Sequence, residues 1–368
     1  MWFIRNMEKS PEEVKENPIA PPKGKNPFSG FTFPISFSMR YDKMNPRDGG
    51  MRMGEKIRLG ISTCLLGESV RFDGGHKFDH FLVHTLGQYV EYVPVCPEVE
   101  CGLGVPRESM HLEGDPQNPR LVTSKTHIDH TDRMVQFARR RVQELEKEDL
   151  CGFIFKSNSP SSGMERVKVY DRHGVPSKVG VGIFARVFME HFPLLPVEED
   201  GRLNDPKLRE NFIERIFTLR RWRQIRGERL TLNKIIEFHT RHKLLILSHS
   251  PSHYQQMGKL VAQGKTIPAP ELCRQYETLL LEALQRKATP RKNSNVLMHM
   301  MGHFKNFLSS DEKQELLEVI DRYRRELIPL IVPITLLNHY VRKYPTPYLK
   351  EQVYLQPHPI ELQLRNHV

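Results

Sequence analysis

Short apolar runs alternate with amphipathic stretches in the first half of the chain. Ile57–Ser62 (IRLGIS), residues 91–95 and residues 151–156 (CGFIFK) have the length and apolar content of buried strands. Residues 76–88 and 129–149, which lie between these runs, are typical of helices. The alternation strand, helix, strand, helix, strand predicts a Rossmann-like α/β domain with a parallel sheet and right-handed crossovers.

Further strands and helices are predicted after residue 120. A short strand is expected near residues 121–122, another at 166–170 and a helix at 180–191. From Pro206 onward the pattern is helical, with a stripe formed by Phe212, Ile216, Leu219 and Trp222. Later helices are expected to start near Thr231, Pro251, Pro270, Thr289 and Ser310.

These patterns divide the chain into three regions. Residues 56–200 form the predicted α/β domain, and residues 201–368 form a mostly α-helical domain. Residues 1–55 are rich in proline, glycine and asparagine without a sustained period, so we expect an extension of low order with no catalytic role.

Charge is distributed unevenly over these regions. The whole chain carries a net charge of +11, while residues 56–200 carry −3 and residues 201–368 carry +12. A basic domain beside a near-neutral one suggests an anionic partner held by one half for chemistry in the other. The alternative is an ordinary solvated basic surface.

The sequence also bears on the cell compartment. The longest apolar run, residues 327–337, contains two prolines, and the first ten residues lack the apolar core of a signal peptide. Five cysteines are present, an odd number. We therefore expect a cytoplasmic protein whose thiols are reduced and available as metal ligands.

Candidate chemistry follows the ends of the three predicted strands. Cys64 comes after the first strand, Cys96 and Cys101 come after the second, and the serine-rich loop 157–163 comes after the third. Parallel sheets bind ligands at the carboxyl ends of their strands, so we expect these groups to converge.

Spacing alone leaves the role of the thiols open. Cys96 and Cys101 have a borderline spacing for zinc, and no second pair accompanies them. Three thiolates without a fourth suit an iron–sulfur cluster with one open position. Cysteines with no ligand at all are the remaining alternative.

A family resemblance narrows these alternatives. The motifs SxCLLG with VRFDGG, PVCPEV with GLGVPR, and KSNSPSSGMERVKVY occur in this order within residues 56–200, which resemble the thiouracil desulfidase family. The segments FHTRHKLLILSHS and LQPHPIELQLRNHV resemble the YbgA-type domain that often follows it. The fused form resembles desulfidases that remove sulfur from 4-thiouridine in transfer RNA.

The resemblance implies a [4Fe–4S] cluster held by three cysteines. Cys64 and Cys96 match two of these positions, whereas Ser162 stands where many relatives have the third cysteine. We expect Cys101 to supply the third thiolate from a neighbouring loop. Ser162 as an oxygen ligand and loss of the cluster are the alternatives. Cys151 is expected to be a small buried hydrophobe.

Replacing C=S by C=O is a hydrolysis, which needs a base to activate water. Glu98 is the first candidate, followed by Glu100 and Asp73; a carboxylate here could instead cap backbone N–H groups. The serines and the lysine of the third strand end are expected to orient the base, bind the uracil edge or hold a phosphate, or else to form an ordinary turn. They are Lys156, Ser157, Ser159 and Ser161.

The helical domain offers a dense basic run and two histidine pairs. The run Arg220, Arg221, Arg223 and Arg226 is predicted to contact RNA phosphates, or else to form a solvated helix end. The pairs His249/His253 and His299/His303 have i, i+4 spacing, for which we expect interhelix hydrogen bonds or RNA contacts rather than a metal. Three functions stay open: desulfidation of transfer RNA, desulfidation of free thiouracil, and nucleic-acid binding without catalysis.

Overall fold

The computed structural model describes residues 56–227 and 230–367. The extension predicted for residues 1–55 therefore lies outside the described residues. Among these, no helix combines the length and the apolar character needed to cross a membrane.

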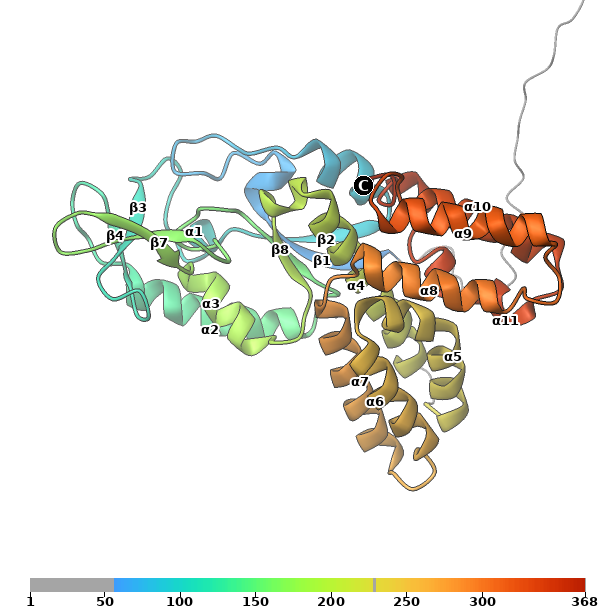
Figure 1. Cartoon of the computed structure of the whole chain (residues 1–368). Helices are drawn as coiled ribbons and strands as arrows, with labels where there is room; N and C mark the ends of the chain where they lie inside the picture. The colour runs from blue at the N-terminus through green and yellow to red at the C-terminus, as the bar shows by residue number, and fades with distance from the viewer. Residues whose placement is uncertain (1–55, 228–229, 368) are drawn as a thin grey trace, which may run out of the picture. The chain divides into compact units, whose positions relative to one another are not determined.

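A four-stranded parallel sheet forms the centre of the α/β domain (Figure 1). Its order is β2-β1-β5-β8, with β1 at Ile57–Ser62, β2 at Val90–Val95, β5 at Phe153–Phe155 and β8 at Val197–Glu199. β1 pairs in parallel with β2 and with β5, and β5 pairs in parallel with β8. The parallel sheet predicted from the first three strands is confirmed. β8 was not predicted, because a three-residue strand ending in two glutamates gives no apolar run.

Two helices lie side by side in this domain, α2 at Thr131–Glu146 and α3 at Ile183–His191 (Figure 1). The buried positions of α2 recur at helical spacing: Met134, Phe137, Ala138, Val142 and Leu145. Both predicted helices are confirmed. α2 is shorter than predicted at both ends, and α3 begins later than predicted.

The helix predicted over residues 76–88 is shorter and irregular. It consists of a π-helical turn, Phe81–Thr85, followed by a 3-10 turn, Leu86–Gln88. The Asp79 carboxylate accepts a hydrogen bond from the Leu82 N–H at 2.9 Å, which caps the turn and explains its late start.

A second sheet, of order β4-β3-β6-β7, lies apart from the first. It contains β3 (Met110–Glu113), β4 (Arg120–Thr123), β6 (Val167–Tyr170) and β7 (Pro176–Gly180). The sequence predicted β4 and β6. It missed β3 and β7, because MHLE and PSKVG mix polar and apolar residues without a clear period.

The second half of the chain is helical, as predicted. Its long helices are α4 (Pro206–Gly227), α5 (Leu232–His249), α6 (Pro251–Ala262), α7 (Ala269–Gln285), α8 (Pro290–Gly302), α9 (Ser310–Arg324) and α10 (Ile331–Lys343). Shorter elements are α1 (Pro97–Glu100), α11 (Pro347–Lys350) and the 3-10 turns Thr63–Leu66, Arg202–Asn204, Val353–Leu355 and Ile360–Leu362.

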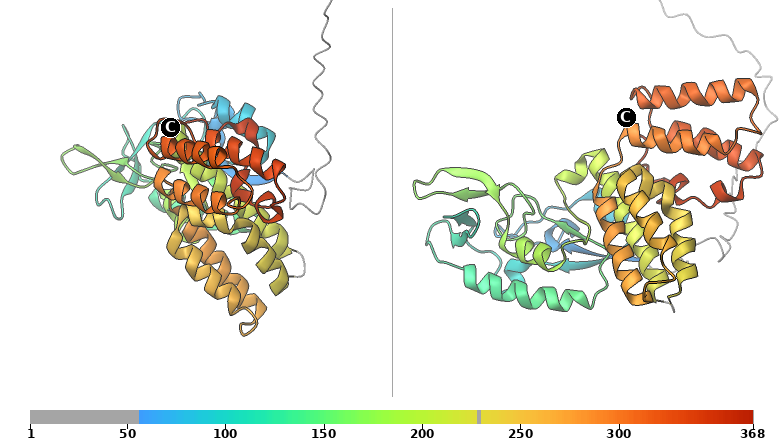
Figure 2. Two further views of the ribbon diagram at one scale, coloured as in Figure 1. Left: turned by 45° about the vertical axis from the view of Figure 1, so that its right-hand side comes forward. Right: turned by 60° about the horizontal axis from the view of Figure 1, so that its bottom comes forward.

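Side-chain caps fix several of these helix starts. Thr231 and Thr289 accept backbone hydrogen bonds at the first turns of α5 and α8, and Ser309 forms a full capping box with Glu312. α8 and α9 run side by side (Figure 2).

Two hydrophobic clusters hold the described residues together. The first joins the strands β1, β2 and β5 to the helices α2 to α7, so it crosses the predicted domain boundary at residue 200. Ile213, Ile216 and Phe217 of α4 belong to it. The second cluster joins the end of α5 to α8, α9 and α10. α4 therefore belongs to the core of the α/β domain as much as to the helices that follow it.

Candidate functional site

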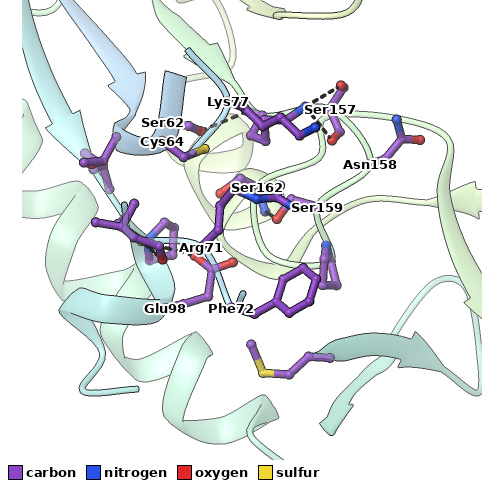
Figure 3. A pocket seen from close by; sticks show the side chains of 18 of the residues that line it. Ser62, Cys64, Arg71, Phe72, Lys77, Glu98, Ser157, Asn158, Ser159 and Ser162 are labelled. Atoms are coloured by element: carbon purple, nitrogen blue, oxygen red, sulfur yellow. Dashed lines mark hydrogen bonds between the residues drawn. The ribbon is translucent and has the colours of Figure 1, made fainter. Parts of the chain in front are cut away.

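The carboxyl ends of β1, β2 and β5 surround a cavity of about 490 Å³ (Figure 3). These strands are parallel, so their ends lie at one edge of the sheet. The residues immediately after each strand line the cavity, including Cys64 after β1, Cys96 after β2 and Lys156 after β5. The predicted convergence of the three strand ends is confirmed.

Two buried thiols face this cavity. Cys64 and Cys96 are each 9% exposed and both line it. Burial raises the pKa of Cys64 to about 11 and that of Cys96 to about 12, and the nearby Glu98 carboxylate adds to both shifts. Without a cation between them, both groups are neutral thiols at pH 7. All five cysteines of the chain are free.

Cys101 and Ser162 are the two residues that the sequence offers as a third ligand. Cys101 follows α1, is partly exposed, and its Sγ donates a hydrogen bond to the Glu98 carbonyl at 3.2 Å. It is not among the residues that line the cavity, whereas Ser162 is, at 3% exposure. Cys151 is buried in the hydrophobic core, as predicted.

Glu98 is the carboxylate that lines the cavity (Figure 3). Its Oε1 accepts a hydrogen bond from the Ser161 hydroxyl at 2.5 Å, and Ser161 is in turn 2.9 Å from the Ser159 hydroxyl. The Cys96 thiol donates to Oε2 at 3.6 Å, and Arg107 Nη2 lies 4.0 Å from Oε1. Glu98 is thus connected to two serine hydroxyls and to one of the two cavity thiols.

The other two candidate bases, Glu100 and Asp73, are both engaged in hydrogen bonds and ion pairs. Glu100 accepts a hydrogen bond from the Cys96 N–H at 2.7 Å and pairs with Arg141 at 2.9 Å. Burial raises the pKa of Glu100. Asp73 is exposed and pairs with Arg71 at 3.3 Å, a hydrogen bond that lowers the pKa of Asp73. Neither carboxylate lines the cavity. The backbone-capping role foreseen as an alternative for Glu98 belongs to Glu100 instead.

Lys156 lines the cavity and pairs with Asp200, an aspartate that sequence reasoning missed. Lys156 Nζ is 2.8 Å from Asp200 Oδ2 and donates to Ser157 Oγ at 3.0 Å. Asp200 also accepts the Ser157 N–H at 2.7 Å. Asp200 directly follows β8, so recognition of that strand would have placed it at the same sheet edge.

Two family models match the chain on either side of α4. The model described as 2-thiouracil desulfurase matches residues 59–200. The model described as "Protein of unknown function (DUF1722)" matches residues 243–359. The "Uncharacterized protein YbgA" of Escherichia coli (strain K12) is 32% identical over 167 residues, which are 45% of this chain and 98% of that protein. The chain belongs to the YbgA family. It carries a thiouracil desulfidase-like domain fused to a YbgA-type domain.

One solved structure is also similar. It is titled as the [4Fe-4S]-dependent thiouracil desulfidase TudS, and it is 26% identical over 41% of this chain and 95% of its own. The TM-score is 0.35, so this likeness supports no statement about the fold.

The predicted RNA-binding arginines of α4 have partners within the chain, in the α/β domain for two of them and in the helical half for the others. Arg223 donates to the Leu150 carbonyl at 2.7 Å and pairs with Asp149 at 3.0 Å, and Arg220 lies 3.9 Å from the same aspartate. Arg221 donates to the Pro357 carbonyl at 2.5 Å. Each of the three guanidinium groups therefore has a partner within the chain, and its position is accounted for without RNA.

Arg226 is the most exposed of the four, with 45% of its side chain accessible, and it pairs with Glu277 on α7 at 3.0 Å. Arg226 therefore braces α4 against α7. A role of the four arginines in binding RNA stays a prediction.

The first histidine pair, His249 and His253, forms hydrogen bonds. His249 Nε2 lies 3.0 Å from Glu214 on α4, and its Nδ1 lies 2.7 Å from the Arg286 carbonyl. His253 Nδ1 lies 2.8 Å from the Ser250 hydroxyl at the start of the same helix. The interhelix hydrogen bond expected for this pair is therefore present at His249.

Among the described residues, the side chains that approach closely enough to share a metal ion are Glu210, Glu214 and His358. The Arg365 guanidinium already pairs with both carboxylates, at 3.2 Å and 2.8 Å. A cation at this point would have to displace a buried guanidinium, so we interpret the cluster as a structural ion pair.

Proposed function

We propose that the chain is a [4Fe–4S]-dependent desulfidase that converts the C=S group of a thiolated uracil to C=O and releases sulfide. The observation that carries the proposal is the placement of Cys64, Cys96 and Glu98 around one cavity. The match of residues 59–200 to the 2-thiouracil desulfurase model supports it.

The donor set fits an iron–sulfur cluster. Cys64 and Cys96 offer soft sulfur ligands, and their raised pKa values mean that the buried thiols become favourable thiolates only beside a cationic group. We propose Cys101 as the third ligand, because a thiolate binds iron better than the hydroxyl of Ser162 does. Its side chain would have to leave the Glu98 carbonyl.

A bound cluster supplies a soft Lewis acid that takes up the sulfur of the substrate. The chain supplies the water chemistry. Water adds to the ring carbon as Glu98 removes one of its protons. The C–S bond then breaks, the remaining O–H proton is lost as C=O forms, and the sulfur leaves with these two protons as hydrogen sulfide, so that one water is consumed for each sulfide formed. Ser161 holds the Glu98 carboxylate through a 2.5 Å hydrogen bond, and Ser159 extends this path for protons.

We further propose that the preferred substrate is 4-thiouridine in transfer RNA rather than free thiouracil. The charge of +12 in residues 201–368, against −3 in residues 56–200, favours a polyanion over a small neutral base. Salt-dependent binding of transfer RNA would distinguish the two substrates.

Anaerobic reconstitution tests the cluster. The expected result is about four irons and four sulfides per chain, the content of a cubane cluster. Replacing Cys64, Cys96 or Cys101 by alanine should lower this content, whereas Cys151→Ala should not. An unchanged cluster in Cys101→Ala, with loss in Ser162→Ala, would assign the third position to Ser162. Failure of wild-type protein to bind iron would contradict the proposed function.

A further inference from the structure

The hairpin of β6 and β7 is connected at both ends to the serine-rich loop 157–163 beside the cavity, at one end by the chain itself and at the other by a hydrogen bond. β6 begins four residues after Gly163, the last residue of the serine-rich loop. At the other end, the Gly182 N–H donates to the Gly163 carbonyl at 2.8 Å. A Cβ atom at Gly182 would lie 2.5 Å from the Ser161 backbone, so the two segments are in close contact. The hairpin turn projects from the α/β domain in the views of Figures 1 and 2.

Exposed basic side chains cover this hairpin. Nine successive residues, 171–179, are exposed, and so are Arg166 and Lys168. Within residues 166–178 the acidic residue is Asp171, whose carboxylate accepts the N–H groups of His173 and Val175 in the turn. In the part of the chain that the structure describes, no ion pair joins Lys168 or Lys178 to a carboxylate.

The two lysines face each other across the hairpin. Lys168 of β6 is the direct partner of Lys178 of β7 in the antiparallel register. Partners in such a pair project from the same face, and like charges there repel each other. An anion bound between the lysines would relieve this repulsion. Tyr170, two residues after Lys168, is on the same face and lies 4.9 Å from the His111 ring.

These features contrast with the arginine run of α4, whose guanidinium groups are used in contacts within the chain. We propose that the β6–β7 hairpin is an RNA-binding arm, which holds the phosphate backbone beside the thiolated base that enters the cavity. This inference rests on the proposed function for the identity of the base. Lys168 and Lys178 form the phosphate contact, and Tyr170 offers a ring against which a neighbouring base stacks.

The test compares two double variants of the full chain with equal changes in net charge. Lys168→Glu with Lys178→Glu reverses the hairpin pair. Arg139→Glu with Lys147→Glu reverses two exposed residues, one in the middle of α2 and one at its C-cap, and serves as the control. The probe is an unmodified transfer RNA transcript, and binding is measured over a range of salt concentrations.

We expect the hairpin variant to bind about tenfold more weakly or worse at moderate salt, with a shallower salt dependence, because each lost phosphate contact removes a released counterion. The control should stay within about twofold of wild type. Equal binding by wild type and the hairpin variant overturns the proposal, and so does an equal loss in both variants, which would show a general charge effect.

Sulfide release from free 2-thiouracil separates this inference from the proposed function. The hairpin variant should release sulfide from the free base as fast as wild type does, because neither lysine lines the cavity. Slow sulfide release from the free base by the hairpin variant would show that the hairpin supports the fold of the cavity. This result would overturn the proposal that the hairpin is an RNA-binding arm. If wild type releases sulfide neither from the free base nor from transfer RNA that contains 4-thiouridine, the proposed function fails, while the RNA titration still decides whether the hairpin binds RNA.

Discussion

Glu98 differs from the carboxylates near it in what it contacts. Glu100 and Asp73 do not line the cavity, and they are engaged by backbone N–H groups and by arginines. Glu98 lines the cavity and bonds to a serine hydroxyl and a thiol, both of which carry exchangeable protons. Under the proposed function, this difference makes Glu98 our candidate for the group that exchanges protons with the substrate.

Glu98→Gln should therefore retain the fold and lose sulfide release by roughly a hundredfold or more, the usual scale for a general base. Iron content and thermal unfolding report on the fold, and sulfide release reports on the reaction. Asp73→Asn is the matched control, since it removes an exposed charge outside the cavity, and it should retain near-normal activity. Loss of activity in both variants would mean that general charge, rather than the base, was affected.

The residues of the site divide into those that the sequence predicted and those that it did not. Cys64, Cys96 and Glu98 were predicted because each follows an apolar run, and parallel strands end at one edge of a sheet. Asp200 was missed, since β8 is short and includes the buried Glu198 and Glu199. The direction of the Cys101 side chain depends on packing around α1, which no spacing pattern records.

At the scale of elements, α4 contributes to both halves of the molecule. Ile213, Ile216 and Phe217 pack into the core that includes β1 and β5. Arg223 on the same helix reaches the segment between α2 and β5. The sequence showed the apolar stripe of α4 but could not show that the arginines beside it have partners from about 70 residues earlier in the chain.

Arg223→Glu should accordingly destabilise the protein rather than act on RNA binding alone. The variant places a carboxylate against Asp149 and leaves the Leu150 carbonyl without its donor, changes that cost on the order of a few kcal/mol in partly buried positions. Chemical denaturation measures this loss. If the variant is as stable as wild type but binds RNA more weakly, the arginine run contacts RNA as the sequence predicted.

Two of the buried histidines of α5, His239 and His242, make stability depend on pH. Burial lowers the pKa of His239 to about 4 and that of His242 to about 3. The unfolded chain binds protons near pH 6.5 and the folded chain does not, so stability is full above about pH 6.5 and falls as the pH drops towards 4.

His242→Gln should make this loss shallower by up to about 1.4 kcal/mol per pH unit, because one proton fewer is taken up on unfolding. The measurement is the free energy of unfolding between pH 7 and pH 4.5 in wild type and variant. The slope, not the stability at one pH, is the quantity compared. Identical slopes would mean that His242 is protonated in the fold.

For the whole molecule, the shared core limits how far the two domains can be separated. The family models suggest a boundary at residue 200, yet the first hydrophobic cluster continues into α4, α6 and α7. A fragment that ends at residue 200 should expose the apolar surface that α4 covers and should be poorly soluble. Gel filtration and circular dichroism of that fragment check this expectation. A soluble, cooperatively folding fragment would show that the α/β domain is independent.

The most direct test of the central claim uses the reconstituted full-length protein, 2-thiouracil and water labelled with oxygen-18. Under anaerobic conditions without a reductant or oxidant, each uracil formed should carry one labelled oxygen and should be matched by one sulfide released. Glu98→Gln and Cys64→Ala, measured in parallel, should form little of either product. Uracil without the label, a requirement for an added oxidant, or equal product from the Glu98→Gln variant would contradict hydrolytic desulfidation at this cavity.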